Sequence, residues 1–170
     1  FRAGLDFGFA LPWKHSSIWF YNSAGIADGA RLNTLTNFYF GGFGNNWVDW
    51  QEVRRYRESH ALPGLDISQL EANNYGKLLL EWGLPPVRFK RAGRPELYVT
   101  WMSAALFATG LVTDLDDAAL RREVWDVGAQ LDFKVVLFSN MSTTLSVGYA
   151  RAWDDNGNGQ NEVMVSLKIL

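Results

Sequence analysis

The side chains that most often perform catalysis are scarce in this sequence. Histidine occurs only twice, and His15 stands two residues before Ser17. Positions i and i+2 of a strand share a face, so His15 and Ser17 have the arrangement that a base and its nucleophile require. No acidic residue stands beside them as a third member, and His60 follows Ser59 in a stretch without regular pattern. We therefore expect no catalytic residues and predict that the chain is not an enzyme.

One short segment is similar to the start of a calcium-binding loop. Asp154, Asn156 and Asn158 alternate, and Gly159 is the sixth residue. The twelfth position, which should supply a bidentate carboxylate, is Val165 and falls in a predicted strand. Since the chain also has no cysteine, thiolate metal sites and disulfides are excluded. The segment is better interpreted as a solvated turn, and we predict neither metal nor cofactor.

Two clusters of charge lie outside the regular patterns. The first is basic and falls in a predicted connection, where it could meet anionic lipid headgroups or a periplasmic partner, or remain a solvated turn. The second lies in a long loop and could pair with carboxylates and lysines of the strands if that loop folds inward, or pair with itself at the surface. The first cluster comprises Arg88, Lys90, Arg91 and Arg94; the second comprises Glu52, Arg54, Arg55, Arg57 and Glu58.

The pattern that dominates the chain is alternation with a period of two, which predicts β-strands. It is clearest over residues 125–137, where Trp125, Val127 and Leu131 alternate with Asp126 and Gln130. Most predicted strands approach the roughly 9–11 residues that cross a bilayer when tilted. Eight strands are predicted, at 2–12, 15–24, 33–41, 70–84, 95–111, 122–137, 141–153 and 161–170, with one long connection at about 42–69.

The composition of the polar face indicates which side of the sheet meets lipid. A soluble barrel of the lipocalin kind shows the same alternation, but its polar face is the exterior and carries long charged side chains. Here that face is rich in glycine and alanine with a few charges, which suits the cramped interior of a small barrel. We predict an interior polar network of Asp6, Lys77, Glu81, Gln130, Asp132, Lys134 and Lys168.

Aromatic residues make up 15% of the chain and include eight tryptophans. Tryptophan settles at the boundary between lipid and water, and barrels in the outer membrane carry girdles of such rings. No run of about 18 apolar residues is present, so a transmembrane helix is not expected. The predicted interfacial aromatics, all near strand ends, are Trp13, Trp19, Trp82, Trp125 and Trp153.

From about Phe38 onward, the order of features resembles the C-terminal half of the surface-antigen barrels, the BamA-type assembly and translocation proteins of the outer membrane. In that family a strand ending in Gly-Gly enters a long loop that folds into the barrel and carries a Val-Arg-Gly-Phe/Tyr motif. Here Gly41-Gly42 ends a predicted strand, and the residues at the motif position are Leu62, Pro63, Gly64, Leu65 and Asp66.

The motif itself is altered. Its arginine falls on Pro63, and the aspartate expected on a partner strand falls on Ala108. Both ends of an ion pair are thus replaced together, which avoids an unpaired buried charge. The resemblance therefore implies a diverged relative, and the loss of the pair argues against the family's assembly or translocation activity.

Residues 1–170 are thus predicted to form a single all-β domain, an antiparallel up-and-down transmembrane β-barrel of about eight strands. No signal peptide is visible, so we expect the chain to be the C-terminal part of a longer envelope protein. The eight strands would close alone, pair with a second copy, or form half of a barrel of about 16 strands. The expected partners are the lipid bilayer of the bacterial outer membrane and either a second barrel copy or an upstream periplasmic domain, with no nucleic acid.

The expected function is that of a membrane anchor, or of the membrane half of a larger envelope protein. An outer-membrane assembly or translocation barrel is the alternative. A lipid-modifying barrel enzyme is less favoured; it rests on the His15–Ser17 spacing, which resembles that of PagL-type lipid A deacylases. A soluble ligand-binding barrel is the remaining alternative.

Overall fold

The computed structural model describes residues 1–13, 15–27, 36–44, 53–138, 140–155 and 157–169. The described part is all-β apart from one short 3-10 turn, η1. No helix in these ranges is long and apolar enough to cross a membrane. The strands are β1 (Arg2–Ala10), β2 (Ser17–Ile26), β3 (Phe38–Phe40), β4 (Leu70–Ala72), β5 (Asn74–Gly83), β6 (Val87–Arg94), β7 (Leu97–Thr113), β8 (Arg122–Leu137), β9 (Met141–Trp153) and β10 (Gly159–Ile169), with η1 at Arg55–Arg57.

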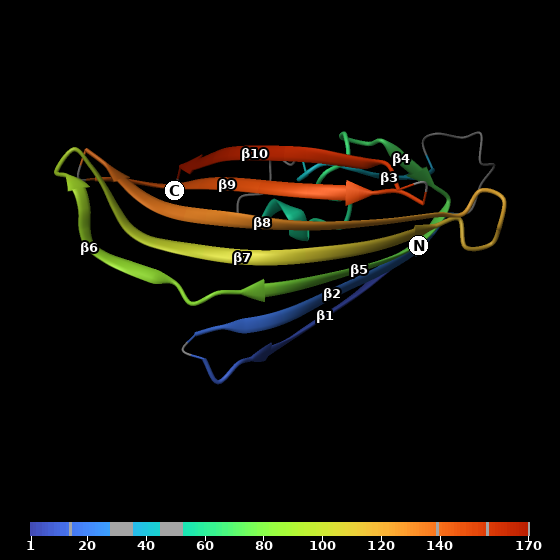
Figure 1. Ribbon diagram of the computed structural model, residues 1–170, viewed down its shortest axis with the longest axis horizontal. Helices are drawn as coiled ribbons and strands as arrows, with labels where there is room; N and C mark the ends of the chain where they lie inside the picture. Colours follow the sequence, from blue (N-terminus) through green and yellow to red (C-terminus); the bar gives the residue numbers. More distant parts are fainter. Residues whose placement is uncertain (14, 28–35, 45–52, 139, 156, 170) are drawn as a thin grey trace.

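Eight of the strands form one antiparallel sheet in the order β1-β2-β5-β7-β8-β9-β10, with β6 paired to β7. β5 and β6 share one position in this order, because both pair with β7 and only Leu84-Pro85-Pro86 separates them. Proline has no backbone N–H to donate to a ladder, so the two prolines interrupt what is otherwise one long strand. The sheet is strongly curved, and β3, η1 and β4 lie on its concave side (Figure 1).

The prediction of an antiparallel all-β chain is confirmed. The sheet is not a closed barrel, because among the described residues β1 and β10 pair with each other at no position. Each therefore has a strand neighbour on one side only. The sheet also has seven positions rather than eight, since β5 and β6 occupy the same one.

Two predicted elements are placed differently by the structure. The segment 33–41 is not a strand of the main sheet: its described part contains only β3, which pairs with β4 in a separate two-stranded sheet. The basic segment expected to be a connection is instead β6, which pairs with β7 through an irregular register. Local alternation does not specify which strand is the partner: β3 pairs with residues 30 or more positions away, whereas β6 pairs with the strand that directly follows it.

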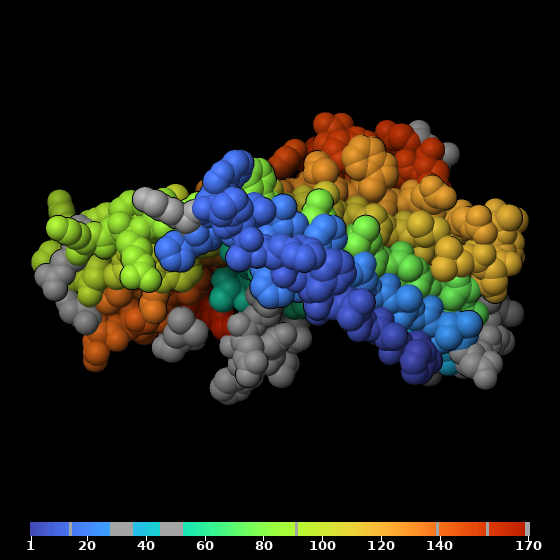
Figure 2. Space-filling view, turned by 90° about the horizontal axis from the view of Figure 1, so that it is seen from below, coloured from blue at the N-terminus to red at the C-terminus, as the bar shows by residue number. Residues whose placement is uncertain are grey.

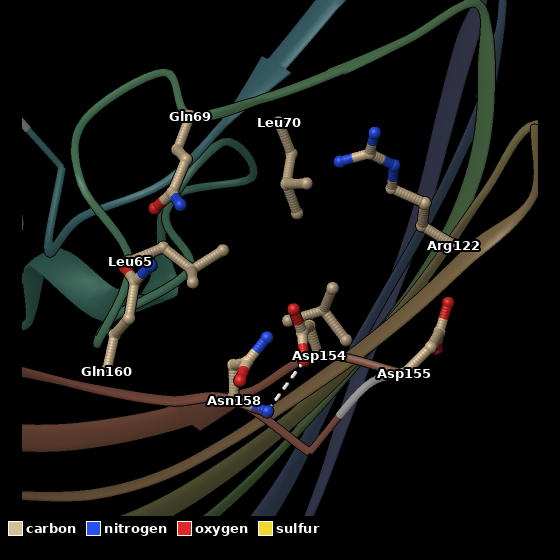
Figure 3. Close-up of a pocket in the computed structure, with 9 residues that line it drawn as sticks. Leu65, Gln69, Leu70, Arg122, Asp154, Asp155, Asn158 and Gln160 are labelled. Carbon is tan, nitrogen blue, oxygen red and sulfur yellow. Dashed lines mark hydrogen bonds between the residues drawn. The ribbon is translucent and has the colours of Figure 1, made fainter.

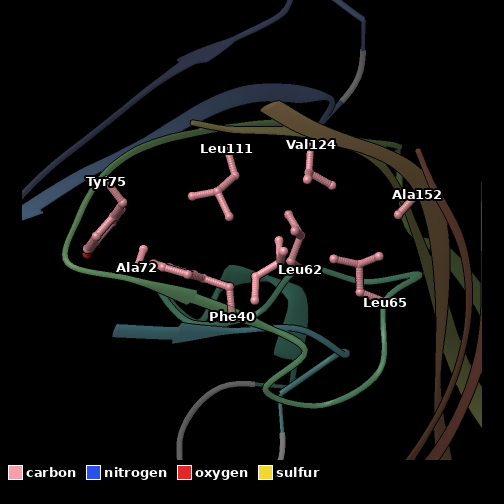
Figure 4. Packing of buried hydrophobic residues seen from close by; sticks show 9 residues of the cluster. Phe40, Leu62, Leu65, Ala72, Tyr75, Leu111, Val124 and Ala152 are labelled. Atoms are coloured by element: carbon pink, nitrogen blue, oxygen red, sulfur yellow. The ribbon is translucent and has the colours of Figure 1, made fainter. Parts of the chain in front are cut away.

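The buried apolar core lies between the sheet and the chain on its concave side. One cluster joins Phe40, Leu62 and Ala72 of that chain to Tyr75, Leu111, Val124 and Ala152 of the sheet, whose side chains point toward one another in Figure 4. A second joins Phe43 and Tyr56 to Leu79, Phe107 and Ala150. The concave side is therefore filled by the protein's own chain.

Candidate functional site in the concave side of the sheet

The candidate site is formed where the chain between β2 and β5 folds against the concave side of the sheet. We call the described part of this chain, residues 36–44 and 53–73, the inner loop. Its two halves are tied by a β-bridge between Gly42 and Leu62. Contacts between the inner loop and β5, β7, β8 and β10 define the site, and they are described in turn.

The first contact is an ion-pair cluster around Glu81 of β5, whose side chain is fully buried. Arg57 forms a bidentate pair with it, with Nε 2.6 Å from Oε2 and Nη2 2.8 Å from Oε1. Arg54 donates to the same carboxylate, and its Nη2 donates to Ser103 Oγ at 3.0 Å. The Arg57 guanidinium also lies 5.2 Å above the Tyr21 ring. Two positive charges thus converge on one buried carboxylate, a strong arrangement because bidentate charged hydrogen bonds are among the strongest in proteins.

Asp132 of β8 extends this cluster. Its Oδ2 lies 3.7 Å from Arg54 Nε, while its Oδ1 accepts hydrogen bonds from Ser146 Oγ at 2.7 Å and from Gln130 Nε2 at 2.6 Å. The Gln130 amide also donates to the carbonyl of Val53 in the inner loop. Four strands, β5, β7, β8 and β9, and the loop are therefore joined by one polar network.

Lys77 forms the second contact. Its ammonium group donates to the backbone carbonyls of Glu58, Ser59 and Ala61. An ammonium has three donors, so the three carbonyls satisfy it completely. The chain after η1 is thereby held against β5 by a buried lysine that is 6% exposed.

Glu162 of β10 forms the third contact. Its two carboxylate oxygens accept hydrogen bonds from the backbone N–H of Phe43 at 3.2 Å and of Gly64 at 3.0 Å. Gly64 has a φ of +97°, and a Cβ there would lie 2.5 Å from the backbone nitrogen of Ala152. Only glycine permits this approach of the loop to β9.

Aromatic stacking completes the attachment. The ring of Tyr56 stacks on Phe107 of β7 with centroids 4.1 Å apart, and Phe43 packs edge-on against the same ring at 6.0 Å. Burial raises the pKa of the Tyr56 hydroxyl well above its ordinary value of 10. Tyr56 therefore packs against the sheet as a neutral phenol.

The predicted interior residues all lie on the concave face, but they differ in burial. Lys77, Glu81, Gln130 and Asp132 are buried and contact the inner loop. Asp6 is exposed on β1, and Lys134 and Lys168 are half-buried. Lys168 pairs with Thr144, and Asp6 pairs with Tyr21, which places both on the concave face without a contact to Glu81.

The predicted interfacial tryptophans fall into two pairs and one exception. Trp125 and Trp153 stack with ring centroids 4.4 Å apart at the end of the strands near the β9–β10 turn. Trp13 and Trp82 lie 6.4 Å apart at the opposite end of β5. Trp19 is cross-strand neighbour to Glu81 and so lies on the concave face, not with the outer aromatics as predicted.

A hollow of about 440 Å³ opens beside the ion-pair cluster, and His15 and Ser17 lie at its wall. Trp19, Arg54 and Lys134 line it as well. The Ser17 hydroxyl accepts a hydrogen bond from Trp19 Nε1 at 3.2 Å. The structure therefore gives Ser17 a tryptophan as its partner.

A second hollow, of about 260 Å³, lies between the inner loop and the β9–β10 turn (Figure 3). There Asp154 accepts from the backbone N–H of Asn158 at 2.8 Å, and Asp155 from that of Glu123. Among the described residues no three histidine, aspartate or glutamate side chains converge on a metal position. Asn156 lies outside the described residues.

Four of the five residues at the motif position are buried, Asp66 is exposed, and the segment does not carry the charge pair. Leu62 and Leu65 are core residues, Pro63 is fully buried, and Gly64 is the close contact with β9. Ala108 shares a register with Leu80 and Val127, and therefore lies on the outer face, where a carboxylate would not reach the loop. The inward-pointing arginines of this loop are Arg54 and Arg57 instead.

Glu162 is a loop anchor that the sequence analysis does not predict. A signal was present, since Glu162 alternates with Met164, Ser166 and Lys168 and so belongs to the concave face.

Comparisons of the chain with protein-family models, with curated proteins and with solved structures found no match. The function must therefore be argued from the geometry alone.

Proposed function

We propose that this chain is the membrane-embedded part of an outer-membrane β-barrel, serving as an anchor or as the membrane half of a larger envelope protein. The observation that carries the proposal is the inverted polarity of the sheet. Its concave side buries charged groups, among them Lys77, Glu81 and Asp132, whereas its convex side exposes large apolar side chains on every long strand.

The convex apolar side chains are too numerous for an ordinary soluble surface. Leu78 and Leu80 of β5, Leu131 of β8, and Val163 and Val165 of β10 are between 39% and 69% exposed. Monomeric soluble proteins rarely expose contiguous apolar patches larger than a few hundred Å². Lipid is the solvent that accepts such a surface, while the polar interior is typical of outer-membrane barrels.

The ends of the strands support a definite orientation. The connections at 11–16 and 138–140 have six and three residues and join strands at one end of the sheet. Those at 27–73, 114–121 and 154–158 have 47, eight and five residues and join strands at the other end, so the two longest connections share that end. Outer-membrane barrels have short periplasmic turns and longer extracellular loops. The inner loop would then enter from the extracellular end, and the Trp125–Trp153 and Trp13–Trp82 pairs would lie toward the two interfaces.

An assembly or translocation barrel is the second candidate. The observation that favours it is that β1 and β10 each lack a second strand neighbour among the residues that the structure describes, because an open edge is a template for another strand. In lipid those edges must be satisfied by further strands, from this protein or from a second copy.

The test compares neighbouring positions on one strand. Because the chain has no cysteine, the variants Val165→Cys and Ser166→Cys can each be labelled with one fluorophore in protein folded into lipid vesicles. Val165 is 69% exposed on the convex side, whereas Ser166 is half-buried on the concave side. We expect spin-labelled lipid tails to quench the label at 165 and not the label at 166.

Two outcomes oppose the proposal. Stronger lipid quenching at 166 than at 165 would mean that the sheet is oriented inside out. A monodisperse, β-rich monomer obtained without detergent would exclude a membrane-embedded protein altogether.

A further inference from the structure

One strand of the main sheet is basic, exposed and not used by the proposed barrel anchor. β6 pairs with β7 only, since β2 begins opposite the end of β5. In the described residues β6 therefore presents a free backbone edge. Over its eight residues it carries four basic side chains and no acidic one, in a chain of net charge −2.

The position of β6 is set by the proline break. Beyond Leu84-Pro85-Pro86, β6 continues the line of β5 and, with the first residues of β7, forms a hairpin that projects past β1 and β2 (Figure 1). Its atoms lie at the surface at one end of the molecule (Figure 2). The hairpin extends from the end of the sheet that carries the short turns, the end assigned to the periplasmic side.

Apolar side chains accompany the charges. Val87 is 45% and Phe89 36% exposed, and the Trp13–Trp82 pair lies directly before the proline break. Arg88 and Lys90, which alternate with Val87 and Phe89, are exposed as well. Val87 pairs with Met102 on the convex side, whereas Arg88 pairs with Trp101 on the concave side. Long basic side chains at a free strand edge can extend to charged headgroups while the apolar groups on the other side meet acyl chains.

Protection of a free edge does not by itself account for the charge. Either sign of charge keeps an edge strand from pairing with another chain. The other two edge strands carry mixed charge: β1 has Arg2 and Asp6, and β10 has Glu162 and Lys168. Among these three edge strands, only β6 carries charges of a single sign, so its charge favours an anionic binding partner.

We propose that β6 binds the phosphate headgroups of anionic phospholipids at the membrane surface, an inference that rests on the membrane-embedded function above. Continuity with the Trp13–Trp82 pair and with the convex apolar face favours lipid over an acidic protein segment. Each basic side chain near an anionic surface contributes roughly 1 kcal/mol, about five-fold in affinity.

The experiment uses protein folded in a nonionic detergent and mixed with equal mole fractions of phosphatidylglycerol and phosphatidylcholine. Native mass spectrometry counts the lipids that remain bound. We expect preferential retention of phosphatidylglycerol, and a loss of up to about 25-fold in that preference for the double variant Arg88→Gln, Lys90→Gln. Raising the ionic strength should weaken the preference, because headgroup and side chains remain in contact with water.

The matched control removes two charges at the opposite end of the sheet, in the variant Arg121→Gln, Arg122→Gln, and should retain the preference. The inference is overturned if the wild-type protein retains both lipids equally, or if the control loses as much as the β6 variant. It is also overturned in favour of a protein partner if a hexaglutamate peptide binds in a β6-dependent way and phosphatidylglycerol does not.

Failure of the proposed function is seen separately. If the protein proves to be a detergent-free monomer, the membrane-embedded barrel is refuted. The same variants are then compared by co-sedimentation with vesicles of phosphatidylcholine alone or with 30% phosphatidylglycerol, and equal binding of wild type and β6 variant refutes the headgroup site.

Discussion

The ion pairs of Glu81 offer the sharpest test of how the inner loop is held. Glu81→Gln keeps the size of the side chain and removes its charge, leaving Arg54 and Arg57 with one carboxylate fewer. Glu81 is fully buried, while the side chains of the two arginines are 17% and 23% exposed. Breaking a buried pair by removing one partner costs about 3–5 kcal/mol.

The lower end of that range applies here. Both arginines line the hollow beside the cluster and are partly exposed, and Arg54 keeps Asp132 at 3.7 Å. We therefore expect the loop-closed state to lose about 3 kcal/mol, which is an increase of roughly 100-fold in the population with the loop released.

Trypsin measures that population directly, because the loop carries Arg54, Arg55 and Arg57. When opening and closing are fast relative to cleavage, the cleavage rate follows the open fraction. Glu81→Gln in folded protein should therefore be cut at the loop about 100 times faster than wild type, with the products identified by mass spectrometry. Glu123→Gln, which changes an exposed carboxylate on β8, should alter the rate little.

A cleavage rate for Glu81→Gln within three-fold of the wild-type rate would refute this reasoning. It would mean that the apolar contacts of Tyr56 and Leu62 hold the loop and that the ion pairs contribute nothing net. A second variant separates charge from packing: Arg54→Met, Glu81→Leu and Arg57→Met together remove all three charges. Because this variant also lacks two of the trypsin sites, its rate is compared with that of wild type for cleavage after Arg55 alone. Much of the protection at Arg55 should be restored, since apolar replacements of buried ion pairs are often neutral.

Two further predictions concern the same loop. Gly64→Ala places a Cβ 2.5 Å from the Ala152 nitrogen at a φ of +97°, so it should lower the free energy of unfolding in urea by about 1–3 kcal/mol. The control Gly76→Ala, whose Cβ would meet nothing within 4 Å, should leave that free energy unchanged. Equal urea midpoints for the two variants would contradict the close contact at Gly64. The pKa of His60 lies below its ordinary value of 6.5 because of burial first and of the Arg2 charge second. As the pH falls through 6.5, His60 binds a proton more readily in the unfolded chain than in the folded protein, so the free energy of unfolding should decline between pH 7 and pH 5. In His60→Gln the urea midpoint should depend less on pH than in wild type. An unchanged pH dependence would show that His60 is not the group responsible.

Several features of this protein follow from the sequence alone. Alternation over residues 125–137 and 141–153 predicts long strands and assigns each side chain to a face, because the pleat has a period of two. The concave position of Lys77, Glu81 and Asp132 follows from the same pattern. The possibility that Arg54 and Arg57 pair with these strands followed from charge and from the absence of alternation in the loop.

Other features depend on which strands pair. Phe38–Phe40 reads as a strand equal to the others, yet it pairs with Leu70–Ala72 and leaves the main sheet. Residues 87–94 alternate only over their first four positions, yet the adjacent β7 supplies a partner and makes the whole segment a strand. A strand's own residues do not specify its neighbour, because backbone hydrogen bonds are the same for every sequence.

The sequence by itself determined the strand-forming segments, their polar and apolar faces, and an interior face that is rich in small residues and carries a few charged ones. Only the tertiary structure decided that Glu81 holds two arginines and that Glu162 binds the backbone of Phe43 and Gly64. It also decided that, within the described ranges, β1 and β10 do not pair with each other. The physical reason is the separation along the sequence of the residues that make each contact. Alternation is a property of neighbouring residues, whereas an ion pair across 24 positions, or a carboxylate and an amide 98 positions apart, exists only after the sheet has curved around its loop.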